Sequence, residues 1–314
     1  MPQRNSGTDW LLFVLLGFFW GSSYLFIKIG VDAGLTPFTL IATRLFFGFV
    51  LLVGVVAVAR EALPRQMRMY GHLLVMAILS VALPFSLITW AEQSVESTLA
   101  ATLNASVPLF VIPIAAIVLI DEKITVNKVV GVVVGFIGVA ILVGFDPGVL
   151  NGTDVLPALA LIGSSISYAA GGVYARRFAH GLRPMIPAVV QVGFALVITA
   201  VLALIFESPI SFPGRFDALL AVVWLGLLGS GLAYLVFFRL LRNWGATRTS
   251  LVAYLLPVYG IALGALVLSE RVDTRLVLGT LLVIAGIALV NLRGRWLPAL
   301  GRDTAAERAE SPRS

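Results

Sequence analysis

The chain has 314 residues, of which 59% are hydrophobic and 12% are charged, and its mean hydropathy is +1.00. Because an ordinary soluble domain carries about 25% charged residues, this composition excludes a soluble globular fold and indicates a membrane protein. The net charge of +6 does not indicate nucleic-acid binding, since the Lys and Arg residues are scattered through short gaps between apolar runs. The absence of cysteine excludes disulfides and thiolate metal sites.

Ten segments are mainly apolar over about 20 residues, the length that a helix needs to cross a bilayer. The stretch at 1–9 leads into the first of them without a small-residue cleavage site, so we expect this segment to be retained as a span. A polar break at 146–154 leaves half of the segments on each side. The expected spans are Trp10–Ile29, Pro37–Ala59, Gly71–Ala91, Ser97–Ile120, Asn127–Phe145, Val155–Ala175, Met185–Phe206, Asp217–Leu240, Ala246–Ser269 and Arg275–Leu292.

The two sides of the break repeat the same features in the same order. Glu122 follows the fourth span as Glu270 follows the ninth. Internal repetition of this kind is typical of transporters. Because each half has an odd number of spans, the second half must enter the membrane from the opposite side. We therefore expect an all-α integral membrane protein of ten transmembrane helices, built as two inverted five-helix repeats at 10–145 and 155–292.

Charge placement predicts the orientation of these helices. If the N-terminus lies inside, most of the 22 Lys and Arg residues fall in cytoplasmic segments. The positive-inside rule then places both termini in the cytoplasm, 1–9 before the first repeat and 293–314 after the second. The tail at 293–314 is polar, and we expect it to be disordered. The expected location is the inner (plasma) membrane of the cell, with lipid as the surrounding partner.

Several motifs, taken together in order and spacing, resemble the EamA-type branch of the drug/metabolite transporter (DMT) superfamily over about 10–292. They are Trp20-Gly-Ser-Ser-Tyr-Leu-Phe-Ile-Lys28, Arg44, the run Ala101–Leu109, Asp121-Glu122, Tyr254-Leu-Leu-Pro257 and Ser269-Glu270-Arg-Val-Asp273. The resemblance implies an exporter or permease of small metabolites, such as amino acids, with a central cavity and alternating access. The second half lacks the Trp-Gly-Ser-Ser and Lys elements, so we do not expect a two-fold symmetric site.

The first span carries candidate solute-binding residues on one face. Trp20, Tyr24 and Lys28 are spaced four apart, which stacks them along a helix, and Ser23 lies within the same motif. Aromatic rings with polar tips suit a small amphipathic solute, and Lys28 could attract a carboxylate. The alternative is an aromatic belt with a lysine that reaches to the interface.

Arg44 lies about seven residues into the second span, among apolar neighbours. A charge at that depth is costly, and it usually pairs inside the bundle or lines a water-filled path. Arg44 is therefore a candidate binding or conformational residue, and a static ion pair between helices is the alternative. Gln191 occupies the equivalent position in the second half.

Prolines within the spans predict interruptions of the helices. Pro84, and the matched pair Pro108 and Pro257, each remove an N–H from the helix ladder and free a carbonyl that protein or water must bind. We expect them to be conformational points near a cavity, although membrane helices also tolerate proline for packing alone. Asn104 and Ser106 precede Pro108 and are candidate solute-binding residues.

Further polar residues are candidates for binding the solute or for close packing of helices. They are Ser164 and Tyr168 in the sixth span, Tyr234 in the eighth and Tyr254 in the ninth. At the expected outer end, Trp90 and Glu92 either gate the mouth or form a solvated hairpin.

Two duplicated features have structural interpretations. We expect Glu122 and Glu270 to make a repeated cap or salt bridge in the turn to the next helix. Pairs of glycines four apart, such as Gly131 and Gly135, permit close helix contact. We expect that contact within the bundle of a monomer, and a homodimer is the alternative.

Motifs for ATP hydrolysis, zinc proteases and serine hydrolases do not occur, and the sequence predicts neither an enzyme nor a cofactor or metal. The leading hypothesis is a secondary transporter that exports a small-molecule solute. Apart from helix ends no expected span contains Asp or Glu, which favours facilitated export or exchange over proton coupling. The alternatives are a proton-coupled drug/metabolite antiporter, a lipid-handling protein or a passive channel.

Overall fold

The structure, a computed structural model, describes residues 7–118, 125–143, 155–178, 182–210, 212 and 214–291. In these ranges the regular structure is entirely helical. The elements are α1 (Gly7–Asp32), α2 (Pro37–Ala59), α3 (Met67–Ala77), η1 (Ile78–Ala82), α4 (Leu83–Ala91), α5 (Ser97–Asn104), α6 (Val107–Val118), α7 (Val126–Val143), α8 (Val155–Phe178), α9 (Met185–Phe206), α10 (Phe216–Trp224), η2 (Leu225–Leu232), α11 (Ala233–Thr249), η3 (Ser250–Tyr254), α12 (Leu255–Val267) and α13 (Thr274–Asn291).

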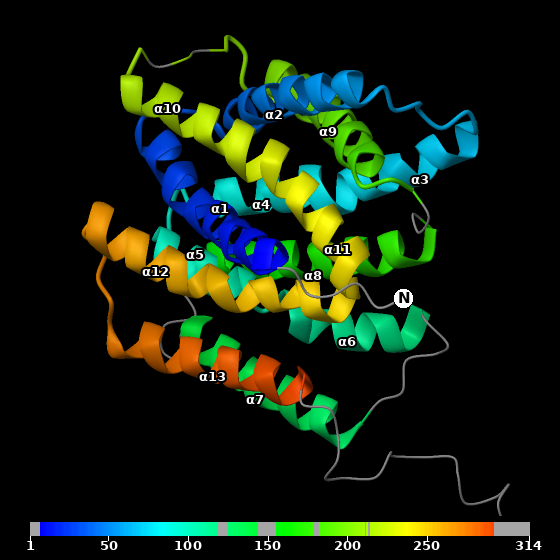
Figure 1. Cartoon of the computed structure of the whole chain (residues 1–314). Coiled ribbons are helices and arrows are strands. Elements are labelled where there is room, and N and C mark those ends of the chain that lie inside the picture. The colour runs from blue at the N-terminus through cyan, green and yellow to red at the C-terminus, as the bar shows by residue number, and fades with distance from the viewer. Residues whose placement is uncertain are drawn as a thin grey trace, which may run out of the picture.

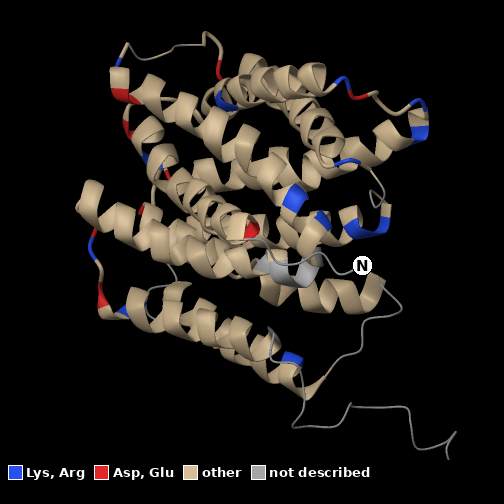
Figure 2. Ribbon diagram, viewed as in Figure 1, with Lys and Arg blue, Asp and Glu red and all other residues tan. Residues whose placement is uncertain are grey.

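The prediction of an all-α membrane protein is confirmed. Within the described residues, eight helices are long and apolar enough to cross a bilayer, and Leu251–Val267 and Thr274–Val290 are shorter apolar helices. Large apolar side chains such as Val58, Ile117 and Leu266 are more than four-fifths exposed, as expected for a surface that meets lipid. Figure 2 shows that most of the ribbon is uncharged.

Several expected spans have different bounds from those predicted, the first and the ninth among them. The ninth was expected to begin at Ala246, but the residues up to Thr249 continue α11, and the chain then passes directly into the 3₁₀ turn η3. The first begins at Gly7, which brings Asp9 into the first turn of α1. Glu122, the break at 146–154 and the tail at 293–314 lie outside the described residues.

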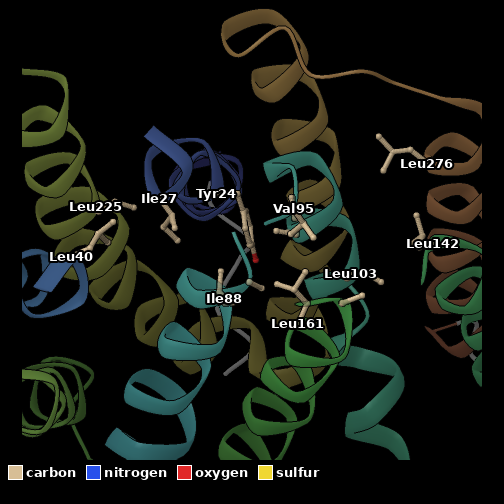
Figure 3. Packing of buried hydrophobic residues seen from close by; sticks show 14 of the residues in the cluster. Tyr24, Ile27, Leu40, Ile88, Val95, Leu103, Leu142, Leu161, Leu225 and Leu276 are labelled. Carbon is tan, nitrogen blue, oxygen red and sulfur yellow. The ribbon is translucent and has the colours of Figure 1, made fainter. Parts of the chain in front are cut away.

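The helices of the two halves pack on one another. The pairs α1 with α12, α2 with α9 and α7 with α13 each join a helix from before residue 146 to one from after residue 154. Figure 1 shows α2 beside α9 at the top of the bundle and α7 beside α13 at the bottom. The buried core is shared in the same way, since Leu161 on α8 lies with Tyr24, Ile88 and Leu103 of the first half (Figure 3).

Corresponding helices of the two halves are interrupted at corresponding places. The third membrane helix contains the π-helical segment η1, and the eighth contains the π-helical segment η2. The fourth helix breaks between α5 and α6, just before Pro108, and the segment predicted as the ninth span changes from η3 to α12 just before Pro257. Segments of π-helix inside α-helices occur frequently at functional sites. The residues around these interruptions are therefore candidates for the functional site.

The glycine pairs make close contacts within this chain. Gly131 and Gly135 of α7 face Gly286 of α13, where an added Cβ would lie 2.5 Å from the Gly135 nitrogen and 2.6 Å from the Gly131 oxygen. Backbone atoms cannot yield as a flexible side chain would, so these positions need glycine for the two helices to touch.

Candidate functional site

Arg44 lies at the centre of the candidate site. It is 2% exposed, and it is among the largest fully buried side chains of the described residues. Its Nε and Nη2 atoms donate to the Ser230 hydroxyl of η2 at 3.3 and 3.2 Å. Its guanidinium also lies over the ring of Phe85 on α4, 4.1 Å from the centroid, which is a cation–π geometry. The guanidinium therefore joins α2 to helices from both halves.

The partners of Arg44 differ from those of a static ion pair. No carboxylate of the described residues forms a salt bridge with it. It interacts electrostatically with Tyr168, Tyr234 and Tyr24, and with the carboxyl group of Glu92. A guanidinium has five N–H donors, and within the described residues its hydrogen bonds are those from Nε and Nη2 to Ser230. The site therefore holds a buried cation that no carboxylate of the described residues neutralises by a salt bridge.

Helix η1 is linked to the neighbourhood of Arg44 through Tyr234, and Pro84 lies directly after it. Proline has no N–H for the carbonyl of Ser80, four residues earlier. The Tyr234 hydroxyl of α11 donates to this carbonyl at 3.0 Å, and the Ser167 hydroxyl of α8 donates to the neighbouring Leu79 carbonyl at 2.8 Å. Hydroxyl groups of the second half thus bond to two main-chain carbonyls beside the interruption.

Aromatic and small residues of α1 complete the centre. The ring of Trp20 meets that of Tyr234 edge to face, with centroids 6.3 Å apart. The Ser23 hydroxyl donates to the Phe19 carbonyl of its own helix at 2.8 Å. A Cβ added at Gly229 would lie 2.8 Å from this hydroxyl. Arg44 is thus brought together with five of the predicted residues, which are Trp20, Ser23, Tyr24, Tyr168 and Tyr234.

A second group of predicted residues lies at the break of the fourth membrane helix. The Asn104 amide donates to the Ser164 hydroxyl at 2.7 Å, and the Ser106 hydroxyl donates to the Leu103 carbonyl at 2.6 Å. Ser165 donates to the same carbonyl at 3.3 Å. These side chains are buried, and they satisfy one another and the backbone where the helix is interrupted.

Three predicted residues lie away from this centre. Trp90 is 41% exposed on the surface. Tyr254 packs from η3 against the core cluster that contains Tyr24. Lys28 lies near the end of α1, where it donates to the Glu92 main-chain oxygen at 3.0 Å and pairs with Asp32 at 3.2 Å.

Glu270 caps a helix, but not the helix that was predicted. Its carboxylate accepts from the backbone nitrogens of Ser97 and Thr98 at 2.8 and 2.9 Å, and so it caps α5 in the other half of the chain. The expectation of a cap in the turn to its own next helix was therefore wrong. Glu207 acts alike on α2, accepting from the nitrogens of Phe38 and Thr39 at 2.8 Å.

Sequence reasoning missed Ser230, Phe85 and Glu207. Ser230 lies in the run Leu-Gly-Leu-Leu-Gly-Ser-Gly-Leu at 225–232, and a glycine-rich run inside a span could have indicated it. Phe85 directly follows Pro84, but nothing in the pattern distinguishes it from a lipid-facing ring. The contacts of Glu207 depend on the packing of α2 against α9, which the sequence does not show.

Comparison with known proteins identifies the family. The sequence profile of the EamA-like transporter family matches residues 9–144 and again residues 155–292. The chain belongs to the EamA-like transporter family. One copy of the EamA match falls on each side of the polar break, as the internal repetition suggested, and the resemblance to this family is confirmed.

Individual relatives agree with the family assignment. The chain is 26% identical over 273 residues to the uncharacterized transporter YoaV of Bacillus subtilis, covering 85% of this chain and 91% of the relative. It is 29% identical over 281 residues to the uncharacterized inner membrane transporter YedA of Escherichia coli, covering 89% of each. One crystal structure matches with a TM-score of 0.67 at 22% identity, covering 90% of this chain and 97% of the other, which shows a shared fold.

Proposed function

We propose that this EamA-family protein is a secondary transporter of the inner (plasma) membrane that exports small solutes bearing a carboxylate, with amino acids as the leading class. The observation that carries the proposal is Arg44, a buried guanidinium without a carboxylate partner among the described residues. A buried charge of this kind is energetically costly in a membrane, and residues of this kind mark the pathways of substrates or ions.

The surroundings of Arg44 suit a small amphipathic solute. A guanidinium binds a carboxylate through parallel N–H bonds, which fixes the orientation of the solute. The rings of Trp20, Tyr24 and Tyr168 offer flat apolar walls with polar tips, as expected for a pocket that binds a small organic molecule. The site that we propose is a central cavity around these residues.

Alternating access is supported by contacts between the halves at both ends of the bundle. In the predicted topology, the Glu207 and Glu270 caps lie at the outer end. At the inner end Asp9 of α1 pairs with Arg239 of α11 at 3.5 Å, and Glu61 pairs with Arg183. We propose that during transport the contacts at one end break while the contacts at the other end remain, so that the two halves rock about the central site.

Counterflow in proteoliposomes tests this proposal. Vesicles are loaded with unlabelled amino acids or other small carboxylates, and the entry of the same labelled compound is followed. We expect saturable counterflow for one class. Flux without saturation or trans-stimulation would indicate a channel, and transfer of labelled phospholipid without counterflow would indicate a lipid-handling protein.

Arg44→Gln tests the role of the guanidinium, because glutamine occurs naturally at the equivalent Gln191. Loss of one partner of a buried charge pair costs about 3 kcal/mol, so we expect the half-saturation concentration to rise about a hundredfold. Arg44→Lys should recover part of this loss, since it keeps the charge without the planar fork. Arg68→Gln removes an exposed cation and is the matched control. Equal half-saturation in wild type and Arg44→Gln would contradict the assignment.

A further inference from the structure

Glu92 has an unusual environment for a carboxyl group. It directly follows α4, the last helical segment of the third membrane helix, and its side chain is fully buried. Neither carboxyl oxygen has a hydrogen-bond partner in the described part of the chain. The hydroxyls of Thr89 and Thr98 are likewise buried without partners. An ionised carboxylate in such a place carries a large desolvation penalty, so the neutral acid is the form that fits.

The charges around Glu92 come from several elements. Lys28 of α1 attracts its ionised form, and Arg44 of α2 does so more weakly. Glu270, from the segment between α12 and α13, and Asp32 of α1 repel it, and Tyr24 of α1 also interacts with it.

Lys28 does not neutralise the carboxylate in this structure. Its ammonium group binds the main-chain oxygen of Glu92 and the carboxylate of Asp32. Burial raises the pKa of the Glu92 carboxyl well above its ordinary value, the positive charge of Lys28 opposes this, and Glu270 adds to it. Burial and the missing hydrogen bonds therefore favour a protonated side chain, against the opposing charge of Lys28.

The outer end of the bundle is closed around this residue. Glu270 accepts hydrogen bonds from Ser97 and Thr98 at the start of α5, five and six residues after Glu92. The carboxylate of Glu270 also interacts electrostatically with Glu92. Separation of Glu270 from α5 would open the outer end and admit water to the neighbourhood of the Glu92 carboxyl.

We propose that Glu92 is a proton-binding site whose protonation is required for the outer end of the transporter to close. In the closed state the carboxyl is buried and neutral. In the open state the carboxyl group meets water and loses its proton to it. The carboxylate that results can then pair with Lys28. The proposal rests on the proposed alternation of access, but proton binding and closure can be measured without any solute.

The sign of the pH effect follows from linkage. The closed state binds the proton more tightly than the open state, so raising the pH favours the open state. The ratio of open to closed protein should change by up to tenfold for each pH unit between the ordinary Glu pKa of about 4.3 and the raised value of the closed state. Below this window both states are protonated and the ratio is constant.

The absence of cysteine makes the test direct, because introduced labels are unique. Spin labels at Gln93 and Val272, both exposed, report the distance across the outer end in purified protein in lipid. We expect longer distances to become populated as the pH rises. Glu92→Gln, which is neutral at every pH, should keep the short distance throughout. Glu96→Gln changes an exposed carboxyl of the same turn and should behave as wild type.

A second variant and a spectroscopic measurement test the proposal even if Glu92→Gln does not fold. Lys28→Gln removes the main charge that favours ionisation, so opening should require a higher pH. Infrared spectra of the wild type at about pH 7, where an ordinary Glu is fully ionised, should show a protonated carboxyl band that is absent from Glu92→Gln. A distance that does not depend on pH in the wild type, or that varies equally in Glu92→Gln, would overturn the proposal. Failure of counterflow with the pH effect intact would overturn only the proposed transport function.

Discussion

The hydrogen bond from the Tyr234 hydroxyl to the Ser80 carbonyl predicts how substitutions at the interruption of the third membrane helix change the free energy of unfolding. Pro84 cannot donate to the Ser80 carbonyl, and the Tyr234 hydroxyl occupies that carbonyl at 3.0 Å. Tyr234→Phe should remove the donor from this partly buried carbonyl, whereas Pro84→Ala restores an N–H within the helix. The two substitutions should therefore be coupled, because the second provides what the first removes.

The expected magnitude is small but measurable. Interhelical hydrogen bonds in membrane proteins contribute about 0.6 kcal/mol on average and up to about 1.7 kcal/mol. The Ser80 carbonyl lies in the π-helical segment and cannot accept from Pro84, so Tyr234→Phe should lower the free energy of unfolding by about 1 kcal/mol. In a Pro84→Ala background the same change should cost close to zero, which gives a coupling energy of about 1 kcal/mol.

Unfolding in mixed detergent micelles, followed by circular dichroism, gives the four free energies of the double-mutant cycle. Tyr254→Phe, which removes a tyrosine hydroxyl in η3 instead of the one that bonds to η1, is a comparison substitution in both backgrounds. If Tyr234→Phe destabilises the two backgrounds equally, Tyr234 does not act through the carbonyl that Pro84 leaves free, and the explanation of η1 fails.

Two further predictions concern contacts between the halves. Glu270→Gln should lower the free energy of unfolding by about 1 kcal/mol through loss of the charged cap on α5, and equal denaturation midpoints for this variant and Glu96→Gln would contradict it. Gly286→Ala should destabilise the protein by about 1–3 kcal/mol, because the added Cβ would lie 2.5 Å from the backbone of α7. Gly54→Ala, where nothing lies within 4 Å, should be neutral or slightly stabilising in the same unfolding measurement, and equal effects of the two glycine substitutions would refute the close contact.

Local patterns in the sequence predicted those parts of the fold that depend on local physics. Apolar length and flanking polar residues determine where a membrane helix starts and ends, and the bounds Pro37–Ala59 and Met185–Phe206 agree with the expected spans. The burial of Arg44 also follows locally, because its neighbours in the span are apolar. The duplicated pattern indicated the family before any contact was known.

Local patterns failed where a neighbouring helix decides the outcome. The helix α11 continues through Thr249, where a loop was expected between the eighth and ninth spans. The π-helical form of η1 and η2 could not be predicted, since it depends on donors supplied by other helices, such as Tyr234 for Ser80. A proline indicates that a helix is interrupted, but the protein around it selects the form of the interruption.

The sequence by itself therefore determined that this is a duplicated helical membrane protein with one deeply placed arginine, because hydropathy and charge are local properties of a chain in lipid. Tertiary structure decided what that arginine meets. Ser230 reaches Arg44 because η2 of the second half packs on α2, and Phe85 reaches it because α4 packs on α2 within the first half. Tertiary structure also decided that the carboxylate of Glu270 caps α5 of the first half, since backbone N–H groups at a helix start bind whichever acceptor the packing brings within reach.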